Sequence, residues 1–211
     1  MTIYWGLFLP GLLLLFFPAD RLLSSVVQLR SFDCFQSLED SARHRPWWWV
    51  PLLWIDPLRG LAGTLLLKQA LDLNSPYWDS IPLPGYCLLL GLLVPAIWCQ
   101  TYTRREDQVM LAPLGFVFGI VGALTSWPVA LLGLIMALTG LFAFRQFHAF
   151  FAMGLAAVAL VGFVMEINPH WLVPAVIVVG LPIMISIITG RTLEVPTRDA
   201  SGGKRAKADS V

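Results

Sequence analysis

Charged residues are scarce in this chain: Lys, Arg, Asp and Glu make up 13% of its 211 residues, whereas 57% are hydrophobic. A soluble domain usually carries about 25% charged residues. A chain of this length cannot hide such an apolar excess in a water-soluble core, so much of it must face lipid or a partner. The composition therefore predicts an integral membrane protein. The net charge of +1 predicts no nucleic-acid partner.

Recognisable catalytic and metal-binding patterns are also missing. The three cysteines match no redox or metal spacing, and there is no HExxH, GxSxG or Walker loop. His44, His148 and His170 cannot share a metal ion, because the predicted topology puts His170 on the opposite side of the membrane. We therefore expect no metal site and no cofactor, and the sequence identifies no catalytic residue.

Long apolar runs are what the sequence does have. Seven runs approach the roughly 20 residues needed to cross a bilayer, and a backbone in lipid must satisfy its own hydrogen bonds, which predicts helices. The runs are 3–18, 48–69, 83–99, 109–125, 128–144, 149–165 and 171–189. They predict an all-α transmembrane bundle over residues 1–190. The first run has no preceding Lys or Arg and a poor cleavage site, so we expect a retained span.

Lys and Arg alternate between the connections, and this predicts the orientation. Basic residues mark cytoplasmic loops. They occur in 19–46, in 100–107, at Arg145 and in the tail after 190, and are absent from 70–82, 125–128 and 166–170. The pattern predicts seven spans, an external N-terminus, a cytoplasmic C-terminus and insertion in the plasma (inner) membrane.

The second run is the weakest span, because Asp56 and Arg59 lie in its core. Each central charge costs about 2.5–3.5 kcal/mol on insertion, which nearly cancels the gain from its apolar residues. The alternative is an interfacial segment, with six spans and an internal N-terminus. That alternative puts the arginines of 19–46 outside, so the charge distribution favours seven spans.

The two remaining segments are predicted to lie in the cytoplasm. In 19–46, Leu22, Val26 and Leu29 follow helical spacing between polar residues, which predicts an amphipathic helix at the membrane surface. The tail 191–211 contains Ser201-Gly202-Gly203 and alternating charges, which predicts disorder.

Asp56 and Arg59 form the strongest candidate site. Three residues apart on a helix, they can pair directly, and an ionisable residue inside a membrane is a functional hypothesis by default. Three interpretations stay open: a structural ion pair, contact with a substrate or a lipid phosphate, and a proton-linked role. Lys68, nearer the outer end, is expected to be a snorkelling anchor.

A second candidate group is Arg21 with Arg43, His44 and Arg45, all predicted at the cytoplasmic surface. Arginines and a histidine can bind a phosphate or an acidic headgroup. They also serve simply as topology-determining charges. The partners implied are membrane lipids, and other membrane subunits or a second copy of this chain.

These features predict a non-catalytic membrane protein, either a carrier involved in transport or a subunit of a membrane assembly. The alternative is a membrane-embedded enzyme that acts on a lipid or lipid-linked substrate at the cytoplasmic face. A carrier needs a polar cavity at mid-membrane, whereas an enzyme needs several polar residues converging at one interface.

Overall fold

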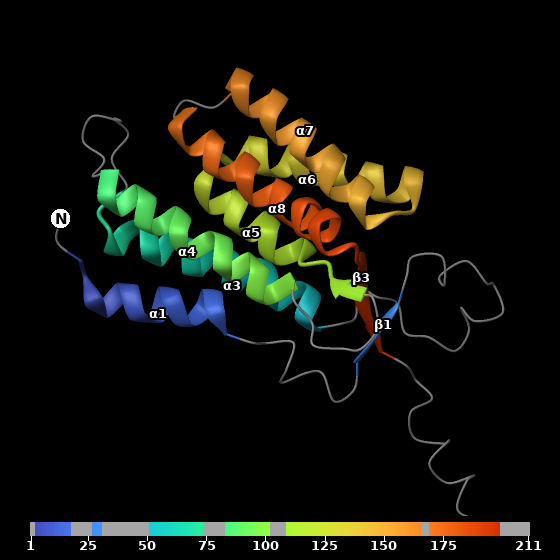
Figure 1. Ribbon diagram of the computed structural model, residues 1–211. Coiled ribbons are helices and arrows are strands. Elements are labelled where there is room, and N and C mark those ends of the chain that lie inside the picture. The colour runs from blue at the N-terminus through green and yellow to red at the C-terminus, as the bar shows by residue number, and fades with distance from the viewer. Residues whose placement is uncertain are drawn as a thin grey trace, which may run out of the picture.

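The computed structural model describes residues 3–17, 27–30, 51–73, 83–101, 109–165 and 169–198. Seven α-helices in these ranges form the body of the protein, and each matches one predicted apolar run, so the all-α prediction is confirmed (Figure 1). They are α1 (Trp5–Phe16), α3 (Pro51–Ala70), α4 (Leu83–Thr101), α5 (Leu114–Leu124), α6 (Trp127–Phe144), α7 (Phe147–Met165) and α8 (Leu172–Thr189).

Four of the described helices, α4, α6, α7 and α8, are long and apolar enough to cross a membrane. The chain is therefore a membrane protein by the composition of its helices. The helices α1 and α5 have only 12 and 11 residues, about 18 and 17 Å of helix, which is well short of a hydrocarbon core of about 30 Å. In contrast, α3 has 20 residues but carries Asp56, Arg59 and Lys68.

The short helix α5 lies at the centre of the bundle. It packs against α3, α6 and α8, and nine of its residues are buried. The helix α1 packs on the other side of α3, and α4 contacts both α1 and α8 (Figure 1). The hairpin of α6 and α7 turns at Arg145, which has a left-handed φ of 57°.

Large apolar side chains cover the outside of the bundle. Phe163 and Val164 of α7 are 85% and 81% exposed, and Ile187 of α8 is 71% exposed. A water-soluble surface does not present contiguous apolar side chains on several adjacent helices. This surface is the one expected of helices that face lipid.

A small three-stranded sheet joins segments that are far apart in the sequence. Strand β3 (Thr192–Arg198) pairs antiparallel with β1 (Val27–Arg30) and parallel with β2 (Val109–Leu111). β1 lies between α1 and α3 in the chain, β2 between α4 and α5, and β3 after α8. The sheet therefore gathers three interhelical or terminal segments at one end of the bundle (Figure 1).

The sheet corrects three predictions. The predicted amphipathic helix is wrong at 27–30, the predicted disorder is wrong at 192–198, and the helix predicted from 109 begins at Leu114. The physical reason is that a ladder between distant segments satisfies these backbone groups, and the local periodicity of one segment carries no information about it. The rest of 19–46 and residues 199–211 lie outside the described residues.

Candidate functional site

The helix α3 carries the buried charges of the candidate site. Asp56 is 9% exposed and Arg59 is 5% exposed, and one Nη of Arg59 lies 2.6 Å from an Oδ of Asp56. The predicted i, i+3 pairing is therefore confirmed. α3 continues as a helix through Pro57, which lies between the two residues.

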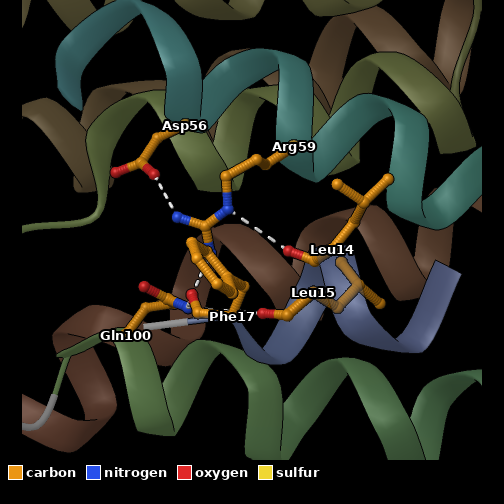
Figure 2. Close-up of polar contacts among 6 residues, drawn as sticks. All are labelled: Leu14, Leu15, Phe17, Asp56, Arg59 and Gln100. Atoms are coloured by element: carbon orange, nitrogen blue, oxygen red, sulfur yellow. Dashed lines mark hydrogen bonds and ion pairs between the residues drawn. The ribbon is translucent and has the colours of Figure 1, made fainter. Parts of the chain in front are cut away.

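Arg59 also binds the end of α1. Its second Nη donates to the carbonyl oxygen of Phe17 at 2.6 Å, and its Nε donates to that of Leu14 at 3.3 Å (Figure 2). The guanidinium carbon lies 5.9 Å and 5.6 Å from the ring centres of Phe17 and Phe116. A helix leaves its last four carbonyls without intrahelical partners, and a cation is favoured at that end. Arg59 therefore caps α1.

Gln100 of α4 completes this cap, and sequence reasoning missed it. Its Nε2 donates to the carbonyl oxygens of Leu15 at 3.3 Å and Phe17 at 3.2 Å (Figure 2). Gln100 is 5% exposed. Gln100 directly follows the apolar run 83–99 and gives a weak signal, because a glutamine at the end of a span is equally compatible with exposure to water.

Lys68 has the corresponding role at the other end of α3. Its ammonium donates to the carbonyl oxygen of Ala123 at 3.0 Å, which lies in the last turn of α5, and sits 4.4 Å from the ring centre of Trp171. The sequence predicted an anchor snorkelling to the interface. In the structure Lys68 is half-buried, caps a short helix and contacts an aromatic ring.

Glycines bring α1 and α5 close enough to α3 for these contacts. A Cβ on Gly11 would lie 3.1 Å from the Gly63 carbonyl oxygen, which places the backbones of α1 and α3 in direct contact. A Cβ on Gly60 or Gly119 would overlap the backbone of α5 or α3, respectively. Gly60 and Gly119 thus allow α3 and α5 to pack backbone against backbone.

The other candidate residues are not all brought to this site. Arg21, Arg43, His44 and Arg45 lie outside the described residues. His148 lies on α7, with its Nε2 2.7 Å from the Oγ of Ser186. Ser186 also hydrogen-bonds the carbonyl of Arg191, so these contacts tie α7 to the end of α8.

His170 lies at the end of the bundle opposite the sheet. Its carbonyl oxygen accepts a 2.9 Å hydrogen bond from the hydroxyl of Tyr86, and its ring lies 5.4 Å from that of Trp171. Among the described residues there is no cluster of three His, Cys, Asp or Glu side chains that could hold a metal ion.

An apolar groove lies on the other side of α3. It has a volume of about 410 Å³ and is formed by α3, α5, α6 and α7. Its walls include Trp54 and Leu58 of α3, Gly115 and Phe118 of α5, Leu138 of α6 and Phe150 of α7. Asp56 and Arg59 do not line it. The buried charges and the groove are therefore separate features, on different faces of one helix.

Comparison of the chain with protein-family models, curated proteins and solved structures found no match. Functional inference therefore depends on the geometry described above.

Proposed function

We propose that this chain is a seven-span, non-catalytic protein of the plasma membrane that serves as a subunit of a membrane assembly. One observation carries the proposal. Each charged side chain of α3 contacts a protein group: Asp56 and Arg59 bind each other, Arg59 caps α1, and Lys68 caps α5. Side chains with these contacts hold the helices together, and their charges face protein groups and not a transported molecule.

A carrier for polar solutes has less support. Such carriers bind their cargo near mid-membrane through polar groups that face a cavity. The groove described above is apolar, and Arg59 of the polar pair on α3 binds the end of α1 instead. A transport role would therefore require an apolar cargo.

The proposed seven-span topology includes α1 and α5 as short spans, and it is supported by where the strands lie in the chain. β1, β2 and β3 belong to three segments whose surroundings in the sequence are basic, and the sheet joins them at one end of the bundle. Basic segments gathered at one end agree with the positive-inside rule. A reporter active only outside the cell should be active at the N-terminus and inactive at the C-terminus. A cytoplasmic N-terminus would contradict the proposal and favour six spans.

The assembly role is tested by native electrophoresis of membranes extracted in a mild detergent. We expect the tagged chain to migrate in a larger species than the purified chain in the same detergent. Fractionation should place that species in the plasma membrane. Migration identical to that of the purified chain would contradict a stable assembly.

The apolar groove favours a second candidate, an enzyme acting on lipids at the cytoplasmic face with Asp56, Arg59, Arg21, Arg43, His44 and Arg45. The burial of Asp56 and Arg59 away from the groove weighs against it. Incubation of the purified protein with radiolabelled phospholipids tests this candidate. Turnover lost in Asp56→Asn, with an unchanged melting temperature, would replace the assembly proposal with the enzymatic one.

A further inference from the structure

The groove formed by α3, α5, α6 and α7 has the dimensions of a ligand site. Its volume of about 410 Å³ falls in the range of about 300–1,000 Å³ typical of small-molecule pockets. Gly115 and Gly119 of α5 line it, and Leu58 of α3 and Leu138 of α6 form its walls. Because α5 is otherwise buried, the groove is an opening between α3 and α6 onto the central helix.

The apolar lining of the groove is suited to a hydrocarbon chain. The helices α6 and α7 are both long and apolar enough to cross a membrane. On α6, Leu131 and Ile135 outside the groove are 47% and 48% exposed, so the adjoining surface is apolar as well. A water molecule needs two to four polar partners, which an apolar groove does not offer. A lipid chain needs none.

One end of the groove has the character of a headgroup region. Trp54, Leu114 and Phe150 lie in the first turns of α3, α5 and α7, at the end of the bundle that carries the sheet. Tryptophan is enriched where lipid chains meet headgroups. Arg145 is exposed in the turn joining α6 and α7, between the groove residues Leu138 and Phe150 in the chain. A guanidinium there complements a phosphate.

From this arrangement we infer that the groove binds an acyl chain of an anionic phospholipid, with the phosphate held on the side of Arg145. The apolar walls select a hydrocarbon chain, and Arg145 supplies the charge that favours an anionic over a zwitterionic headgroup. The inference rests on the membrane location in the proposed function, and it is independent of the assembly role.

The test is photo-crosslinking of the purified full-length protein in detergent with phosphatidylglycerol that carries a diazirine in one acyl chain. We expect labelled peptides from α5 and α6. Leu138→Trp fills the groove and should lower labelling by about tenfold, whereas Ile135→Trp, on the same helix outside the groove, should leave it unchanged. Arg145→Gln should weaken phosphatidylglycerol binding by about fivefold, the effect of one basic residue near a membrane surface.

Several results would overturn the inference. Equal labelling of Leu138→Trp and the unmodified chain, or labelling confined to the outer face of α8, would mean adventitious contact with detergent-phase lipid. Competition by phosphatidylcholine as strong as by phosphatidylglycerol would remove the role of Arg145. A copurifying protein crosslinked from Leu58 would mean that a helix occupies the groove instead. If Leu138→Trp fails to fold, Leu58→Trp on the opposite wall and the two-lipid competition on the unmodified chain decide the question. Failure of the assembly proposal appears separately, in the native electrophoresis.

Discussion

The helices α1 and α5 pose the same physical problem and solve it differently. Both are apolar, both have fewer than the roughly 20 helical residues of a standard span, and both receive a cation from α3 at their C-terminal end. They differ in burial: α1 buries Phe8, Gly11 and Leu15, whereas nine residues of α5 are buried. A helix end in a low-dielectric setting needs donors for its carbonyls, since each unsatisfied group costs several kcal/mol.

The difference indicates what holds each helix. Packing on several sides fixes α5, so Lys68 adds to a contact surface that is already extensive. Outward-facing Leu9 and Leu13 of α1 are 60% and 61% exposed, so α1 depends on one packed face and on the cap made by Arg59 and Gln100. We therefore expect α1 to be more sensitive than α5 to loss of its cap.

Arg59→Ala should have the largest effect. It removes the donors to Leu14 and Phe17 and leaves Asp56 without this partner, and breaking a buried pair typically costs about 3–5 kcal/mol. We expect a marked fall in melting temperature in detergent. Arg59→Lys keeps the charge but not the three-way geometry, so its melting temperature should be intermediate. Equal stability of all three proteins would contradict the capping role.

Maleimide labelling of a cysteine on α1 tests whether loss of the Arg59 side chain loosens this helix. Leu15 of α1 is fully buried, so Leu15→Cys, with Cys34, Cys87 and Cys99 replaced by serine, should resist a maleimide. Adding Arg59→Ala should expose it. Changing both Asp56 and Arg59 to leucine should recover only part of the stability, because the α1 carbonyls stay without Arg59. Full recovery would mean that the ion pair alone, and not the cap, matters.

Gly119→Ala should have the next largest effect. Its Cβ would overlap the carbonyl of Pro57, so α3 and α5 would have to move apart. Overpacking of this kind costs about 1–3 kcal/mol. The matched control is Gly91→Ala in α4, where nothing lies within 4 Å. There the gain in helix propensity should leave the melting temperature unchanged or slightly higher. A similar loss in both variants would mean that close approach of α3 and α5 is unimportant.

Sequence reasoning located the helices because lipid imposes a rule that is local. A span must satisfy its own hydrogen bonds, so a run of apolar residues suffices to predict one. The rule did not predict the strands, since 27–30, 109–111 and 192–198 find partners only in each other. It also overestimated α5, because the run from 109 continues through residues that pair in the sheet.

Sequence reasoning predicted only the part of the candidate site that lies within one helix. The spacing of Asp56 and Arg59 gives their pairing, but the acceptors of Arg59 lie 42 and 45 residues away on α1. Gln100 and Lys68 are likewise defined by contacts across the bundle. One signal in the sequence could have been used. The last carbonyls of a short helix need hydrogen-bond donors, and a Lys or Arg inside another apolar run can supply them.

Lys68→Met should have the smallest effect, and it tests directly whether α5 depends less on its cap than α1 does. Methionine keeps the length of the side chain and its packing but removes the donor to Ala123 and the charge over Trp171. Loss of a donor to a buried carbonyl costs about 1–3 kcal/mol, and since Lys68 is only half-buried we expect a loss of about 1–2 kcal/mol, with α5 held meanwhile by its buried face. The melting temperature should therefore fall by clearly less than in Arg59→Ala. If Lys68→Met proves as damaging, burial does not protect α5, and capping governs both short helices equally.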